Sequence, residues 1–199
     1  RDRVGLSGVN SINWARIMTQ VVYYFTAAVS LGGPDRKVSF TVPTGNFGDI
    51  FAGYVAKRMG LPIERLVIAT NDNDILARTL KRGRYEMRGV KATTSPSMDI
   101  QISSNFERLL IEAYGRDPSS VRAAMASLKQ SGAFEVQPEA LKAIRKEFRA
   151  ARATEKQVAA TIRETLAETG YLIDPHTASG VFVARKHAKA SSPMVTLST

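Results

Sequence analysis

The chain has 199 residues, of which 44% are hydrophobic, and a formal net charge of +10 at pH 7. This composition suffices for the core of one domain, or of a domain with an appendage, and no apolar stretch approaches the ~18 residues of a transmembrane helix. The absence of cysteine excludes disulfides and thiolate chemistry, whereas the charge leaves open a nucleic-acid partner, anionic substrates or an acidic second half of a longer protein.

The first part of the chain predicts a helix and then a strand–loop–helix–strand unit. A helix is expected from residue 11 to about residue 30, where apolar residues recur at helical spacing. Residues 38–42 are predicted as a buried strand, residues 49–59 as a helix and residues 65–70 as a second strand. Strands joined in this way are expected to be parallel, with a right-handed crossover.

The loop between the first strand and its helix, residues 42–49, has the form of an anion-binding site. Gly45 and Gly48 lack a Cβ atom, so the backbone can approach a ligand closely. The unpaired N–H groups of the first helical turn carry about half a positive charge and favour a phosphate. The loop has neither the Gly-Lys-Ser/Thr of a Walker A loop nor the G-x-G-x-x-G of a dinucleotide site. On spacing alone, a plain strand-to-helix turn is an equal alternative.

Further along, the Asp and Asn residues at 71–74 are interpreted as helix caps, because the glycine and the distant glutamate of a calcium loop are missing. A helix is expected over residues 75–82 and an extended run over residues 85–93. Successive amphipathic helices are predicted between residues 104 and 170, with many basic residues on their outer faces. No aromatic residues are interleaved with these charges, so a solvated surface is favoured over a nucleic-acid site.

Helix starts carry their own signals. A capping box, the Ser/Thr-x-x-Glu/Gln pattern, is expected at Ser104 and at Thr154. His176 follows Asp174 at the start of one more predicted helix, and we interpret this place as a capping region in preference to a catalytic base. Residues 194–199 are predicted as a last strand of the sheet.

The residues of the loop, Pro43-Thr44-Gly45-Asn46-Phe47-Gly48-Asp49, resemble the cofactor-phosphate loop of the threonine synthases, which are fold type II pyridoxal-phosphate enzymes. Other stretches match the same family: residues 10–16, 69–74, 95–100, 103–109 and 172–178. The resemblance extends from one end of the chain to the other, and it is to the longer branch of the family, known from bacteria and fungi.

The resemblance implies an α/β fold with an open, mostly parallel sheet flanked by helices, and with a helical insertion. Residues 1–103 would form the cofactor-phosphate-binding core, residues 104–170 the insertion, and residues 171–199 a last helix and strand that return to the core. The implied cofactor is pyridoxal 5'-phosphate, whose ring nitrogen would meet the hydroxyl of Thr199. Its phosphate would be surrounded by Gly45, Asn46, Phe47, Gly48 and Asp49.

Threonine synthases convert O-phospho-L-homoserine and water to L-threonine and phosphate. By resemblance, the Schiff-base lysine lies upstream of this chain, which begins at Arg1 without Met. We therefore expect a C-terminal piece of a cytoplasmic enzyme, inactive by itself and completed by the missing N-terminal part. No catalytic residue, metal, nucleic acid or membrane is assigned to this piece. Two alternatives are another fold type II lyase, such as a threonine or serine dehydratase, and an inert basic nucleic-acid-binding module.

Overall fold

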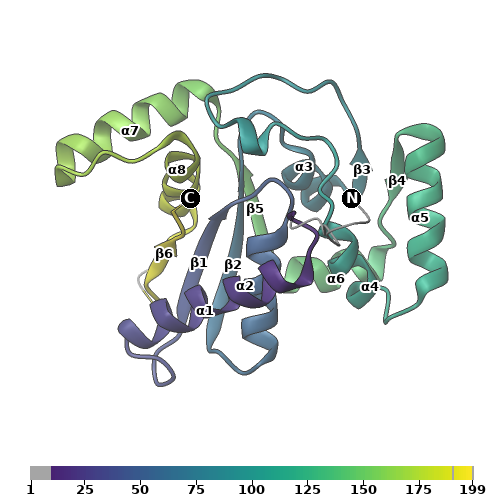
Figure 1. Ribbon diagram of the computed structural model, residues 1–199, viewed down its shortest axis with the longest axis horizontal. Coiled ribbons are helices and arrows are strands. Elements are labelled where there is room, and N and C mark those ends of the chain that lie inside the picture. Colours follow the sequence, from purple (N-terminus) through teal and green to yellow (C-terminus); the bar gives the residue numbers. More distant parts are fainter. Residues whose placement is uncertain (1–9, 190, 199) are drawn as a thin grey trace, which may run out of the picture.

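A four-stranded parallel sheet forms the centre of the computed structural model, which describes residues 10–189 and 191–198 (Figure 1). All of its strand pairings are parallel. In spatial order the strands are β5 (Phe148–Arg152), β2 (Ile63–Thr70), β1 (Val38–Pro43) and β6 (Met194–Thr196). The predicted fold class, an open parallel sheet flanked by helices, is confirmed.

Helices cover both faces of this sheet, and the side-chain alternation of β2 shows how. The helices around the sheet are α1 (Trp14–Ser30), α2 (Gly48–Arg58), α7 (Glu155–Thr169) and α8 (Pro175–His187). Leu66 and Ile68 of β2 belong to the main core, together with residues of α1 and α2. Val67 and Ala69 point to the opposite face and pack with Val183 of α8. Both faces of the sheet are therefore buried, as parallel sheets require.

A smaller region lies beside the edge strand β5 (Figure 1). Its elements are α3 (Ile75–Arg82), β3 (Arg84–Glu86), the short 3₁₀ turn η1 (Pro96–Met98), α4 (Phe106–Ala113), α5 (Pro118–Ser131), β4 (Ala133–Glu135) and α6 (Pro138–Glu147). Strands β3 and β4 form an antiparallel pair. The ring of Tyr85 stacks on those of Phe106 and Phe134, with centroids 5.6 and 5.0 Å apart. These aromatic residues belong to the main core cluster, so the region is continuous with the core around the sheet.

The expectation of helices alone between residues 104 and 170 is wrong. This stretch also contains β4 and β5, and β5 is a strand of the central sheet. Phe148, which lies within the stretch predicted as helical, is fully buried as the first residue of β5. A run of only five residues shows too little periodicity to distinguish a strand from the end of a helix.

The helix starts agree with the sequence in part. Thr154 and Gln157 form both hydrogen bonds of the predicted capping box. The box predicted at Ser104 does not form: Asn105 is the N-cap of α4, without a side-chain cap bond, and Ser104 Oγ instead lies 3.3 Å from Asn46 Oδ1. Ser104 is therefore used to contact the loop ahead of α2.

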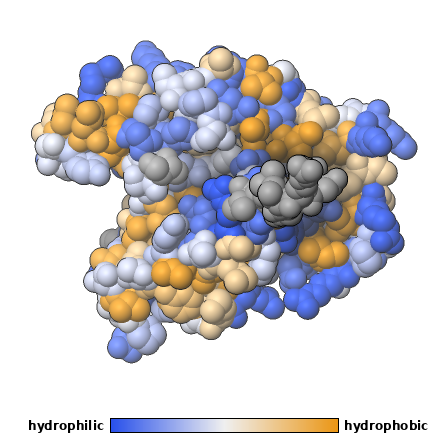
Figure 2. All heavy atoms as spheres, viewed as in Figure 1, coloured by the Kyte–Doolittle hydropathy of each residue, from blue (hydrophilic) through white to orange (hydrophobic). Residues whose placement is uncertain are grey.

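Helix α1 carries a second apolar stripe on its outer side. Trp14, Met18, Val22 and Val29 are between 45% and 61% exposed and recur at near-helical spacing. Figure 2 shows hydrophobic side chains over this helix in the lower part of the view. Among the described residues, no helix is both long and apolar enough to cross a membrane.

Candidate phosphate-binding site

The short loop between β1 and α2 lies at the carboxyl end of the parallel sheet, where ligands bind in open α/β folds. The backbone N–H of Thr44 donates a hydrogen bond of 2.8 Å to the carbonyl oxygen of Ala69 in β2. Its hydroxyl donates a second bond, 2.7 Å long, to the carbonyl oxygen of Val42. These bonds fix the first residue of the loop to the sheet.

Phe47 sets the direction of the peptide groups in the loop. Its φ is 65°, in the left-handed region, which costs a non-glycine residue about 1–3 kcal/mol. Its side chain is fully buried, with ring centroids 5.4 Å from Phe106 and 5.6 Å from Phe148. Packing of this ring offsets the backbone strain and holds the turn immediately before α2.

The carbonyl and N–H groups of the loop differ in their hydrogen bonding. Ser103 Oγ donates a hydrogen bond of 2.7 Å to the carbonyl oxygen of Gly45. The backbone N–H and the side-chain amide of Asn105 both donate to the carbonyl oxygen of Asn46, each at 3.0 Å. By contrast, no acceptor within the described residues receives a hydrogen bond from the backbone N–H groups of residues 45–49. The carbonyls are bound internally, whereas these N–H groups remain available as donors in the described part of the chain.

The two glycines of the loop are not equally constrained. A Cβ atom on Gly45 would lie 2.7 Å from the carbonyl oxygen of Ser97, closer than real Cβ contacts allow. A Cβ atom on Gly48 would lie 3.4 Å from the side-chain amide nitrogen of Asn105, which is ordinary contact. Gly45 is therefore the position at which close packing demands glycine.

A buried polar network holds the turn η1, which includes Ser97, against the loop. Asp99 Oδ1 accepts hydrogen bonds from the side-chain amides of Asn71 and Asn73, at 2.7 and 2.9 Å. It accepts a third bond from Thr93 Oγ1 at 2.7 Å. The cap role predicted for residues 71–74 is thus wrong for the two asparagines, because their side chains anchor the segment around η1. Asp74 holds the N-cap position of α3 but forms no side-chain cap bond.

A cavity of about 200 Å³ opens beside the loop. Gly45, Asn46, Phe47, Gly48 and Asp49 all line it. Its other walls come from the segment around α1, from η1 and from the start of α8, through Ser11, Arg16, Gln20, Ser97, Met98 and His176. Arg16 is the one cationic side chain, and no lysine lines the cavity, among the described residues. The structure thus brings together the predicted loop and the family-like stretches 10–16 and 95–100.

Arg16 and Gln20 line the cavity, although neither is among the residues predicted to contact the cofactor. They lie four residues apart in α1 and so occupy one face of that helix. A polar pair on one side of an otherwise apolar helix was the available signal. Thr199, by contrast, lies outside the described residues.

Asp49 lies in the first turn of α2 and carries a perturbed carboxyl group. Burial raises the pKa of Asp49 from 3.8 to about 6, and a hydrogen bond with Tyr24 opposes this shift in part. Tyr24 Oη lies 2.9 Å from the main-chain oxygen of Asp49 and 3.2 Å from its Oδ1. A hydroxyl has only one proton to donate. If that proton goes to the main-chain oxygen, the second contact is favourable when the carboxyl itself is protonated.

His176 is part of the cavity wall as well as of a helix start. Its Nε2 lies 2.6 Å from Ser97 Oγ, and its Nδ1 lies 3.3 Å from Asp174 Oδ1. Asp174 accepts hydrogen bonds from the backbone N–H groups of His176 and Thr177 at the start of α8. The predicted capping region is confirmed, and the imidazole in addition links α8 to η1. Among the described residues, no group of three or more His, Cys, Asp and Glu could hold a metal ion.

Known proteins resemble this chain in both sequence and structure. A threonine synthase from Pseudomonas aeruginosa is 51% identical over 195 residues, which cover 98% of this chain and 42% of the relative. A crystal structure of a pyridoxal-phosphate-bound threonine synthase from Brucella melitensis is 71% identical, with a TM-score of 0.97 over 100% of this chain and 43% of that one. The chain belongs to the threonine synthase family over the part that it spans. No protein-family model matches it.

The same family recurs in yeast, and more distant enzymes share only the fold. Yeast threonine synthase is 43% identical, with a TM-score of 0.90 over 96% of this chain and 41% of that one. The chain thus spans about two fifths of the length of these threonine synthases. A fungal L-serine ammonia-lyase superposes with a TM-score of 0.59 at 9% identity, which shows a common fold alone. The dehydratase alternative is therefore not favoured over the threonine synthase family.

Proposed function

We propose that this chain is the cofactor-phosphate-binding part of a threonine synthase, a pyridoxal-phosphate-dependent lyase that acts on the phosphate ester O-phospho-L-homoserine. The products are L-threonine and phosphate. The observation that carries the proposal is the loop of residues 45–49, whose carbonyls are bound internally while its N–H groups are left for an anion. The Brucella melitensis relative with pyridoxal phosphate bound supports the same ligand.

The residues fit the phosphate of this cofactor. A left-handed residue followed by a helix turns successive N–H groups toward one point, and such a nest binds anions. The dipole of α2 adds a favourable field at the same place, and Arg16 supplies a full positive charge on the cavity wall. We assign the phosphate to the N–H groups of Gly45, Asn46, Phe47, Gly48 and Asp49. When bound, pyridoxal phosphate supplies the electron sink for proton transfers on the substrate.

The remaining roles of the chain in this reaction are positioning and shielding. The buried ring of Phe47 packs on Phe106 and holds the loop, and the carbonyl oxygen of Ser97 packs against Gly45. Asp49 faces Tyr24, and its carboxyl, with a pKa raised to about 6, is more readily neutralised beside the phosphate than the carboxyl of an exposed aspartate. Thr199 keeps its proposed role beside the ring nitrogen of the cofactor.

We also propose that this chain works only together with the upstream part of a cytoplasmic enzyme. That part would supply the lysine, and the exposed apolar stripe of α1 is a surface on which it could pack. The proposed units are the core at 1–103, the insertion at 104–170 with β5 assigned to the core, and the return at 171–199. Neither a nucleic acid nor a membrane is required for the activity.

Replacement of Gly45 by valine in the complete enzyme tests the proposal. The new side chain meets the carbonyl oxygen of Ser97, so it must displace η1 or the loop. We expect the affinity of the apoenzyme for pyridoxal phosphate to fall about 100-fold, or about 2.7 kcal/mol, as measured by fluorescence titration. Gly89→Val is the matched control, because a Cβ atom on Gly89 meets nothing within 4 Å. Equal affinities of the two variants would overturn the assignment of the loop.

A further inference from the structure

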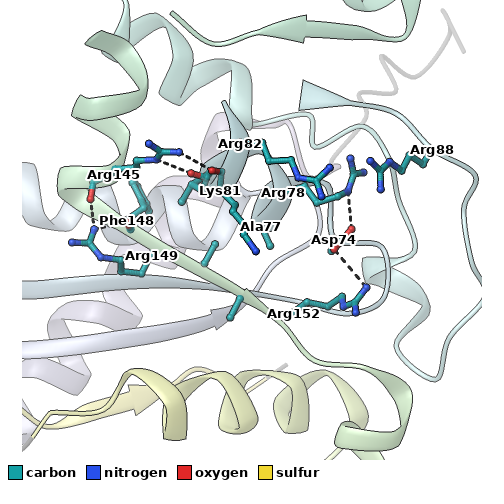
Figure 3. Close-up of a pocket in the computed structure, with 13 residues that line it drawn as sticks. Asp74, Ala77, Arg78, Lys81, Arg82, Arg88, Arg145, Phe148, Arg149 and Arg152 are labelled. Atoms are coloured by element: carbon teal, nitrogen blue, oxygen red, sulfur yellow. Dashed lines mark hydrogen bonds and ion pairs between the residues drawn. The ribbon is translucent and has the colours of Figure 1, made fainter. Parts of the chain in front are cut away.

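A second and larger cavity, of about 740 Å³, lies between α3 and the edge strand β5. Figure 3 shows the residues that line it, and none of them lines the cavity beside the loop. On its open side, β5 has no partner strand among the described residues. The two cavities are therefore separate sites on the chain.

The charge of this cavity is almost entirely of one sign. Seven cationic side chains line it: Arg78, Lys81, Arg82, Arg88, Arg145, Arg149 and Arg152. Asp74 is the one carboxylate among the lining residues. We call the cavity lined by these side chains the basic cavity. Like charges gathered near a protein surface repel one another, so such a gathering is unfavourable where no anion offsets it.

Part of the basic cavity has a structural explanation. Arg145 donates hydrogen bonds of 2.7 and 2.9 Å to the carbonyl oxygens of Leu80 and Lys81, which end α3. Arg149 donates to the carbonyl oxygens of Arg145 and Phe148. These two arginines join α6 and β5 to their neighbours and would be retained for stability alone.

Arg78 also has a structural partner. Its Nε lies 2.8 Å from Asp74 Oδ1, and the arginine side chain is only 10% exposed. Both carboxylate oxygens of Asp74 are thereby paired, because Arg152 Nη1 lies 3.7 Å from Oδ2. The single carboxylate of the basic cavity therefore cannot neutralise the rest.

Two cations of the basic cavity have no such structural role. The side chains of Lys81 and Arg82 form no hydrogen bond or ion pair with any described residue. Figure 3 shows the guanidinium groups of Arg82, Arg78 and Arg88 in a row, and Arg78 and Arg88 share the carboxylate of Glu86. Basic residues in the last turn of α3 favour the helix dipole. The dipole does not explain why cations from β5 and from the segment after β3 converge on the same place.

We propose that the basic cavity binds a small phosphorylated anion with several negative charges. Its volume is within the ~300–1,000 Å³ of small-molecule sites, and the guanidinium fork matches phosphate oxygens in pairs. Phe148 is the one aromatic residue of the lining, and it is fully buried. The cavity therefore offers no exposed ring for stacking nucleic-acid bases, which favours a small anion over a nucleic acid.

Calorimetric titration of the complete, pyridoxal-phosphate-loaded enzyme with inorganic pyrophosphate tests this site. The loaded cofactor keeps the probe from the loop beside α2. We expect one pyrophosphate per chain, with an affinity that falls at least about 10-fold in Lys81→Gln/Arg82→Gln. These two side chains hold no described contact, so the substitutions should leave the fold intact, which thermal unfolding checks.

The matched control is Lys142→Gln/Lys156→Gln, which removes the same charge from exposed helix positions outside the cavity. This variant should bind pyrophosphate as the unmodified enzyme does. Absence of binding at millimolar pyrophosphate would overturn the proposal, and so would an equal loss in both variants. Tighter binding of a single-stranded oligonucleotide, weakened by the cavity substitutions, would replace the small anion by a nucleic acid. The apo Gly45→Val enzyme should still bind pyrophosphate, which separates this test from that of the loop.

Discussion

Replacement of Asp49 by asparagine should remove a pH-dependent cost of folding. The carboxyl of Asp49 has a pKa of about 6 in the folded chain, raised from 3.8 by burial. The folded state therefore binds the Asp49 proton more tightly than the unfolded state does, and stability from this group is greatest at low pH. As pH rises from about 4 to about 6, the unfolded state loses the proton first, and the folded state becomes relatively less stable.

The size of this effect follows from the shift. A pKa of about 6 against 3.8 corresponds to about 3 kcal/mol of lost stability above pH 6, at 1.36 kcal/mol for each unit. Asp49 lines a cavity that water can enter, so this figure is an upper bound. Asparagine has nearly the same shape but no charge, and it can still donate a hydrogen bond to the Tyr24 hydroxyl.

Urea unfolding of the apo protein at pH 4 and at pH 7.5 measures the difference. Asp49→Asn should gain stability relative to the unmodified protein by about 2 kcal/mol more at pH 7.5 than at pH 4. Asp35→Asn, at an exposed turn position, serves as the control for the loss of a carboxylate. A stability gain from Asp49→Asn that is the same at both pH values would refute the raised pKa of the buried carboxyl.

Two further predictions concern the helical region and the divided active site. Arg145→Gln should lower the free energy of unfolding by about 1–2 kcal/mol, because two hydrogen bonds to the end of α3 are lost. Lys146→Gln, the control, should change it by less than about 0.5 kcal/mol. Equal urea midpoints of the two variants would contradict this prediction. The isolated chain should form no stoichiometric lysine adduct with pyridoxal phosphate, because covalent attachment needs a positioned, deprotonated amine. Borohydride reduction and peptide mapping check this, and one fully labelled lysine together with phosphate release from phosphohomoserine would show that the active site is not divided as proposed.

The sequence was sufficient to predict the elements around the proposed site that depend on local backbone chemistry. The strand, the loop and helix α2 follow from a short β-branched run, two glycines and a helical pattern that ends before Gly60. The loop is recognisable because an anion site of this kind needs contiguous N–H groups, which are adjacent in sequence. The residues of the loop also carry part of the resemblance to the threonine synthases, which extends along the whole chain.

The rest of the site could not be predicted, because its causes are distant in sequence. Asn105 binds the carbonyl of Asn46, and Ser97 limits the space at Gly45. The polar stretch at 71–74 has the composition of a helix cap, yet Asp99 recruits the side chains of Asn71 and Asn73. In each case a tertiary partner competes successfully with the local preference.

The net charge suggests one kind of anion site, and the loop has another. A charge of +10 points toward an anionic partner, but the proposed phosphate site contains one cationic side chain, Arg16, and binds mainly through neutral N–H dipoles. Its field comes from the backbone and from the position of α2, so the surface cations contribute little to it once they are screened over about 10 Å. The formal charge instead collects in the basic cavity, where side chains from α3, α6 and β5 converge. An anion-binding loop and a basic surface are thus separate consequences of the sequence, and the first does not require the second.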